Sequence, residues 1–204
     1  MSIKQVLEFH RTFGHPVGEG PTLLTEDRFN LRLSLIREEL EETIEAYHEN
    51  DLVKVSDGLA DLSVVISGTM IEFGFFMDDG VEPFSSQEAS FVSPGLYDER
   101  AVEYLKIHTL NYLGNLYSSY FKQDKGGVFD SLHYMLGLVY VTANSLGIPL
   151  DEINEVVHKA NMSKLGEDGK PIYRESDNKI LKGPNFRPPE EDIEAILKAH
   201  GAEL

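Results

Sequence analysis

The chain contains no cysteine among its 204 residues. This absence excludes disulfide bonds, metal sites built on thiolates and catalysis by a cysteine nucleophile. No apolar run approaches the roughly 18 residues that a membrane-spanning helix needs. The opening stretch MSIKQVLEFHRTFGHP also lacks the apolar segment of a secretory signal. We therefore expect a cytoplasmic protein with no membrane partner.

Positive charge is scarce, because 18 Lys and Arg face 35 Asp and Glu and leave a formal net charge of −17. Proteins that bind DNA or RNA need clustered cations to neutralise phosphates, so we expect no nucleic-acid polymer as a partner. The cations are unevenly spread. Between Lys159 and Pro189, seven Lys or Arg stand against four Asp or Glu. This basic segment is a candidate contact for a small anion.

Hydrophobic residues recur at helical spacing along most of the chain, and no segment indicates a multi-stranded sheet. The Gly-, Pro- and Ser-rich stretch at 77–95 predicts a connection, and the chain after Leu165 predicts an irregular tail with short strands at most. We predict one all-α domain over residues 1–204. Helices are expected over residues 2–14, 25–50, 51–74, 97–121, 129–146, 151–162 and 190–200.

An internal repeat divides the long helices into two pairs. Residues 57–79 align with 130–152 without a gap at an offset of 73, and the match extends to 31–79 and 104–152. Any two amphipathic helices look somewhat alike, but these also share a helix-ending glycine followed by an acid. The repeat predicts a four-helix bundle with a pseudo-twofold axis, an intrachain pseudo-dimer. The identical pairs include Asp57 with Asp130, Leu59 with Leu132, Thr69 with Thr142, and Gly74 with Gly147.

The two halves of the repeat differ in their acidic residues. Four carboxylates of the first half have no acidic counterpart in the second. Glu38, Glu39, Glu42 and Asp61 correspond to Asn111, Tyr112, Asn115 and Tyr134. Because these carboxylates are lost as a group, we infer that they share one role and that each chain has one acidic site.

Helical phase separates the glutamates of the stretch REELEETIEAYHEN, which starts at residue 37. At about 100° per residue, Glu41 and Glu45 lie opposite the apolar face and are expected to be solvated. Glu38 lies at the border of that solvated face. Glu39 and Glu42 fall on a flank of the helix whose adjacent turns carry apolar residues. Burying a carboxylate there costs free energy unless another group offsets its charge.

Asp61 lies in a predicted helix that is apolar nearly all round, so its ionised carboxylate needs a partner. Lys54 is the only Lys or Arg from residue 38 to 99, so an ion pair is hard to arrange locally. Glu39 and Glu42, three residues apart on one side of a helix, can face Asp61 from the neighbouring helix. Such hard oxygen ligands suit Mg²⁺ or Mn²⁺.

Several motifs resemble one known family. REELEET followed by DGLADL, then NMSKLGEDGKPIYRES and KGPNFRPP, together with FHRTFGHPV near the start, are similar to motifs of the all-α nucleoside triphosphate pyrophosphohydrolases. These MazG-like proteins include phosphoribosyl-ATP pyrophosphohydrolase-like members and are related to dimeric dUTPases. Their signature is EExxE followed by ExxD on the next helix. Here Glu38, Glu39 and Glu42 match EExxE.

One position departs from this signature. The Glu of ExxD aligns with Gly58, so that ligand is missing. Asp57, four residues before Asp61, is a candidate replacement as a metal ligand. Asp57 also stands near a helix start, where an N-terminal cap is an equally good interpretation. The departure leaves the number of metal ions open.

The resemblance implies hydrolysis of a ribo- or deoxyribonucleoside triphosphate to the monophosphate and pyrophosphate, with Mg²⁺ or Mn²⁺ as cofactor. Glu39, Glu42 and Asp61 would hold the metal, and the metal would lower the pKa of a bound water. Glu38 would orient or deprotonate that water. The substrate-binding candidates in the tail at 158–189 are Asn161, Lys164, Tyr173, Arg174 and Lys182.

Two other functions are open at this stage. A non-catalytic nucleotide-binding or scaffold protein would explain the missing Glu at position 58. A phosphoribosyl-ATP hydrolase would use a different substrate on the same fold. Further homodimerisation of the pseudo-dimer is open as well.

Overall fold

The computed structural model describes residues 2–75, 100–175 and 180–204, and every regular element in these ranges is helical. An isolated antiparallel bridge joins Tyr173 to Ile180 in the tail. None of the described helices combines the length and apolarity needed to cross a membrane. The helices are α1 (Ile3–Thr12), α2 (Glu26–His48), α3 (Leu52–Glu72), α5 (Ala101–Phe121), α6 (Lys125–Ser145), α7 (Leu150–Met162) and α8 (Glu190–Ala199).

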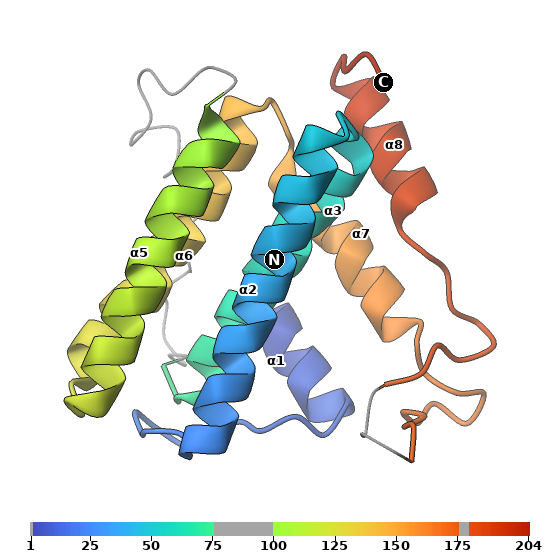
Figure 1. Ribbon diagram of the computed structural model, residues 1–204. Coiled ribbons are helices and arrows are strands. Elements are labelled where there is room, and N and C mark those ends of the chain that lie inside the picture. Colours follow the sequence, from blue (N-terminus) through green and yellow to red (C-terminus); the bar gives the residue numbers. More distant parts are fainter. Residues whose placement is uncertain (1, 76–99, 176–179) are drawn as a thin grey trace.

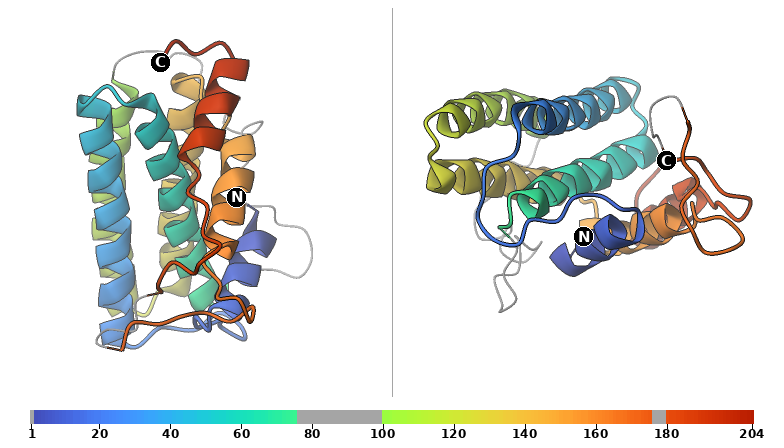
Figure 2. Two further views of the ribbon diagram at one scale, coloured as in Figure 1. Left: turned by 90° about the vertical axis from the view of Figure 1, so that its right-hand side faces the viewer. Right: turned by 90° about the horizontal axis from the view of Figure 1, so that it is seen from below.

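Four long helices form the bundle (Figure 1). Helix α2 packs along α3, α5 packs along α6, and the two pairs meet mainly between α3 and α6. Helices α1, α7 and α8 pack against the side of α3 that faces away from α5. Figure 2 shows the four long rods from below, with α1 and α7 beside them. Helix α3 is therefore central, with Leu59, Leu62 and Ile66 fully buried.

The two helix pairs end at equivalent positions. Helices α3 and α6 both start and finish 73 residues apart. Asp51 and Asp124 cap their first turns by accepting hydrogen bonds from backbone N–H groups three residues ahead. Asn50 and Gln123, which precede these caps, share a positive φ of 57°. The same offset that relates the sequences thus relates the backbone turns.

Helix α6 begins earlier than the sequence predicts. It was expected from Phe129, but it starts at Lys125 and includes Gly126 and Gly127 in its first turn. Glycine disfavours a helix by about 1 kcal/mol, yet the Asp124 cap bonds the N–H of Gly127 at 3.1 Å and offsets that cost. The predicted connection at 77–95 and the first residues of the third long helix lie outside the described residues.

A buried ion cluster closes the lower end of the α2–α3 pair. Glu72 is 2% exposed and accepts a hydrogen bond of 2.6 Å from Nε of Arg28. Its Oε1 also lies 3.5 Å from the guanidinium of Arg32. Arg32 is itself buried and donates from Nε to Thr69 Oγ1 at 2.9 Å. Glu72 offsets the charge of the buried Arg32, whereas Arg28, whose side chain is 27% exposed, also keeps contact with solvent.

Candidate active site

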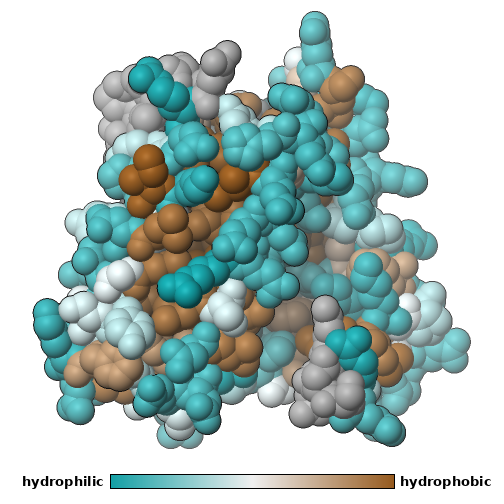
Figure 3. Space-filling model, in the orientation of Figure 1, coloured by the Kyte–Doolittle hydropathy of each residue, from teal (hydrophilic) through white to brown (hydrophobic). Residues whose placement is uncertain are grey.

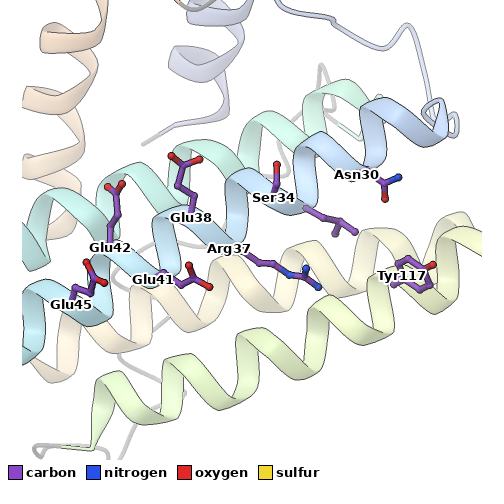
Figure 4. A pocket seen from close by; sticks show the side chains of 9 residues that line it. Asn30, Ser34, Arg37, Glu38, Glu41, Glu42, Glu45 and Tyr117 are labelled. Atoms are coloured by element: carbon purple, nitrogen blue, oxygen red, sulfur yellow. The ribbon is translucent and has the colours of Figure 1, made fainter. Parts of the chain in front are cut away.

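The five glutamates of α2 point in different directions. Glu39 is half-buried, whereas Glu38, Glu41, Glu42 and Glu45 are exposed. Exposure of Glu41 and Glu45 follows the prediction, while Glu42 was expected to be more buried than it is. Figure 4 shows Glu41 extending from α2 toward α5, with Glu38 and Glu42 at the other edge of α2. Glu42 thus stands between the α5 side and the α3 side of the helix.

Helix α3 approaches α2 closely at Gly58. A Cβ built on Gly58 would lie 2.6 Å from Oγ1 and 3.2 Å from Cα of Thr43. Thr43 is fully buried, and its hydroxyl donates to the Glu39 carbonyl oxygen at 2.7 Å. A side chain at position 58 would therefore require Thr43 or the helices to shift. Tight packing against Thr43 accompanies the missing signature carboxylate.

Two adjoining cavities, which we call the α3 recess, flank the same side of α3. The first has a volume of 420 Å³ and the second 150 Å³. Both are lined by Asp57, Asp61 and Glu190. The first continues toward α2, where Glu42 and Glu45 line it. The second continues toward α7 and the tail, where Asn161, Lys164, Lys182 and Phe186 line it.

The tail folds back so that its cations reach this recess. The N–H of Gly183 donates to the Lys164 carbonyl oxygen at 3.1 Å. The N–H of Arg187 donates to Ser163 Oγ at 3.0 Å. Lys182 lies over the ring of Phe186, with 4.4 Å between Nζ and the ring centroid. These contacts tie the basic tail to the C-terminal end of α7.

Burial and mutual repulsion make the carboxylates harder to ionise. Burial, followed by repulsion from Asp61 and Glu42, raises the pKa of Glu39 to about 8. Burial and the neighbouring Asp61 and Glu190 raise the pKa of Asp57 to about 7. Burial also raises the pKa of Asp61 to about 6, although Lys164 opposes the change. A shared cation would relieve all three groups.

Lys164 supplies part of that compensation. Burial lowers its pKa, and the nearby carboxylates of Asp61 and Asp57 oppose this effect. Its Nζ donates to Asn161 Oδ1 at 2.6 Å, which holds the ammonium group in place. We expected an ion pair with Asp61 to be hard to arrange from nearby sequence positions. The cation that interacts with it, Lys164, lies about a hundred residues further along the chain. Lys54 instead pairs with Glu49 at 2.9 Å.

Four of the predicted residues lie outside the recess lining, and one of them is the half-buried Glu39. Tyr173 donates from its hydroxyl to the Phe13 carbonyl oxygen at 2.7 Å, which joins the tail to the end of α1. Arg174 is exposed beside it. Glu38 lines a separate cavity of 610 Å³ between α2 and α5, together with Glu41 and Tyr117. The roles assigned to Glu38, Tyr173 and Arg174 stay predictions.

Sequence reasoning missed Glu190 and Phe186. Glu190 opens α8 and reaches the recess across the end of α7. Acidic residues are common in the first turn of any helix because they complement its dipole, so its position gave no distinguishing signal. Phe186 carries no sequence signal beyond its place in the motif KGPNFRPP.

The donor set of the recess fits a hard divalent cation. Carboxylates of Glu42, Asp57 and Asp61 line the recess, and Glu39 interacts with them from α2. Burial, together with mutual repulsion, raises the pKa values of Glu39, Asp57 and Asp61. Oxygen donors of this kind suit Mg²⁺ or Mn²⁺. Among the described residues, no three such side chains converge tightly enough to hold an ion as they stand. Metal binding would therefore need rotation of these flexible side chains.

Comparisons with known proteins agree with this architecture. The family model of phosphoribosyl-ATP pyrophosphohydrolase matches residues 6–86. An uncharacterized protein of Acanthamoeba polyphaga mimivirus is 31% identical over 178 residues, which cover 78% of this chain and 68% of that protein.

A crystal structure from Exiguobacterium sp. 255-15, described as that of a candidate NTP pyrophosphohydrolase, superposes with a TM-score of 0.51. It is 24% identical, and the match covers 96% of this chain and 93% of that one. This likeness supports the all-α fold. The chain belongs to the all-α nucleoside triphosphate pyrophosphohydrolase superfamily, the MazG-like proteins that include the phosphoribosyl-ATP pyrophosphohydrolases.

Proposed function

We propose that the protein is a Mg²⁺-dependent nucleoside triphosphate pyrophosphohydrolase, which converts a ribo- or deoxyribonucleoside triphosphate to the monophosphate and pyrophosphate. One observation carries the proposal. The α3 recess brings Asp57 and Asp61 of α3 together with Lys164 and Lys182 from the chain after α7. Carboxylates that can carry a cation, next to lysines that can meet an anion, are what a metal–polyphosphate substrate requires.

The carboxylates and the lysine of the candidate site have different proposed roles. Glu39, Glu42 and Asp61 would hold the metal, with Asp57 in place of the carboxylate that Gly58 cannot supply. A metal ion held there would supply charge neutralisation at phosphate oxygens and a lowered pKa of a bound water. Lys164, fixed by Asn161, presents a point charge to the phosphates.

Two further roles concern the edges of the recess. Lys182 is exposed at the mouth of the recess, where it would attract the polyphosphate before binding. Glu38 would orient or deprotonate the attacking water from the α2 side.

The test is release of pyrophosphate from a panel of nucleoside triphosphates with Mg²⁺ or Mn²⁺. We expect turnover of at least one nucleotide. Glu42→Gln and Asp61→Asn should abolish it while the far-UV circular dichroism spectrum stays unchanged. Glu41→Gln is the matched control, because Glu41 is on the same helix but does not line the recess. Full activity of both recess variants would refute the site assignment.

Phosphoribosyl-ATP is the second candidate substrate, because the family model that matches residues 6–86 is the one for its hydrolase. Including it in the panel separates the two functions by their kcat/KM values. Tight binding of nucleotides without turnover of any substrate would instead indicate a binding protein.

A further inference from the structure

Glu190 is a carboxylate of the α3 recess to which the proposed function gives no role. It is the first residue of α8, and it lines both cavities of the recess together with Asp57 and Asp61. The glutamates of α2 line only the larger of these cavities, whereas Lys164 and Lys182 line only the smaller. The three shared carboxylates therefore lie between the acidic and the basic part of the recess.

Packing of α8 fixes the backbone of Glu190 at this place. Ile193 and Leu197, four residues apart on one side of α8, are fully buried, and the helix packs against α3 and α7. Pro188 and Pro189 precede Glu190, and their rings restrict the backbone that enters the helix. The side chain of Glu190 is exposed, so it can rotate toward the recess without a movement of α8.

The helix dipole of α8 does not explain why Glu190 faces other carboxylates. Acidic side chains complement the positive N-terminal end of a helix, and Glu191 and Asp192 of the same turn do so from exposed positions. Glu190 instead repels Asp57, and it does so more strongly than Glu42 does. Among the described residues, no hydrogen bond or salt bridge engages its carboxylate. Such repulsion is unfavourable unless the carboxylates share a cation.

The position of the missing signature carboxylate belongs to the same cavity. Gly58 lines the 420 Å³ cavity together with Asp57, Asp61 and Glu190. Asp57 and Asp61 are four residues apart on α3, so both approach a cation from the same side. Glu190 adds an oxygen donor from another helix. Because Mg²⁺ demands near-octahedral coordination, it needs ligands from several sides.

We propose that Glu190 is a further metal ligand, which joins Asp57 and Asp61 around a Mg²⁺ or Mn²⁺ ion between the two cavities. The inference rests on the proposed function, which assigns the metal to this recess. The described side chains do not yet converge on an ion, so binding draws the exposed Glu190 inward. Figure 3 shows hydrophilic side chains along α2, up to the end of the bundle where Figure 1 places α8. An ion thus reaches the recess over a polar surface.

Binding of Mn²⁺ to the full chain without nucleotide tests this ligand, because the electron paramagnetic resonance signal of the free ion disappears on binding. The wild type should bind Mn²⁺, and Glu190→Gln should weaken the binding at least tenfold. Glu191→Gln is the matched control and should change it less than twofold. Glu191 is the next residue of the same turn but does not line the recess. Equal weakening by the two variants would overturn the proposal, because it would show only a general attraction by charge near α8.

The absence of cysteine permits a second measurement, which reports direct coordination. Thiolates prefer soft metal ions, so Glu190→Cys with one equivalent of Cd²⁺ should give the ultraviolet absorption of a thiolate–cadmium bond. Asp61→Asn in the same chain should weaken that absorption. Glu191→Cys should show at most a tenth of it at the same Cd²⁺ concentration. Equal absorption by the two cysteine variants would overturn the proposal.

These measurements separate the ligand from the proposed function. Weaker Mn²⁺ binding in Asp61→Asn but unchanged binding in Glu190→Gln would remove Glu190 from the site and leave the hydrolase proposal intact. Weaker binding in Glu190→Gln, in a wild type that hydrolyses no nucleotide, would support the ligand and refute the hydrolase. A wild type that binds no Mn²⁺ would overturn the ligand and the metal dependence together.

Discussion

Individual contacts around Gly58 determine which carboxylates the site can use. The close approach to Thr43 removes the room for a side chain at the signature position, while the preceding Asp57 remains free to face the recess. Asp57, one residue earlier, is the ligand that we propose in its place. Rotation of the Thr43 side chain away from Gly58 would break its hydrogen bond to the Glu39 carbonyl oxygen.

Gly58→Ala should lower the free energy of unfolding by about 1–3 kcal/mol, since the added methyl group overpacks the α2–α3 contact. Urea denaturation measures the change. Gly126→Ala is the control, because its Cβ would meet its nearest atom at 3.5 Å, an ordinary contact distance. That variant should be neutral or slightly stabilising. Equal midpoints for the two variants would contradict the close approach.

Lys164→Met should lower kcat/KM for the best triphosphate substrate at least tenfold, or by about 1.4 kcal/mol of transition-state stabilisation. The cause is the loss of a positioned cation in the recess. Lys182→Met should have a smaller effect, because Lys182 is exposed at the mouth. Steady-state pyrophosphate release provides the comparison. A larger loss for Lys182→Met than for Lys164→Met would reverse the assigned roles.

At the scale of whole helices, most of the architecture follows from sequence periodicity. The order of the described helices was predictable, because amphipathic spacing, caps such as Thr25 and Asp51, and helix-ending glycines are local signals. The start of α6 was predicted four residues too late, because Gly126 and Gly127, which disfavour a helix, follow closely after the capping Asp124. The electrostatic interaction of Lys164 with Asp61 was also missed. That interaction depends on how α7 and the tail pack against α3, which no local pattern encodes.

The buried cluster at the end of the α2–α3 pair also joins residues far apart in sequence. Glu72→Leu should destabilise the protein by about 3–5 kcal/mol, because it leaves the buried guanidinium of Arg32 without its counter-charge. Thermal and urea unfolding report the loss. Glu194→Ala removes an exposed ion pair with Lys198 on α8 and should change stability by less than about 0.5 kcal/mol. Similar losses in the two variants would mean that the cluster is not effectively buried.

At the scale of the whole molecule, charge distribution links stability to pH. His15 lies beside His10, with 5.3 Å between ring centroids, and near Arg32 and Arg28. Burial and then the neighbouring His10 and arginines lower the pKa of His15 to about 4, from an ordinary value of 6.5. The unfolded chain therefore binds the proton more readily than the folded chain between these values.

It follows that the contribution of His15 to stability is fully present above pH 6.5 and is lost as the pH falls toward 4. His15→Gln lacks this titration. The difference in unfolding free energy between wild type and His15→Gln should therefore be larger at pH 7.5 than at pH 5.5, as urea denaturation at each pH would show. A difference that grows toward pH 5.5 would mean that the folded protein binds the proton more readily.

The arrangement of the two helix pairs also has a consequence for synthesis on the ribosome. Each pair consists of helices adjacent in sequence, and contacts of this kind form early and fast. The α2–α3 hairpin can thus close, and bring its carboxylates together, while the rest of the chain is still being made. Lys164 is made about a hundred residues after Asp61. The nascent protein therefore passes through a stage in which these acidic groups repel one another before Lys164 is present to offset part of their charge.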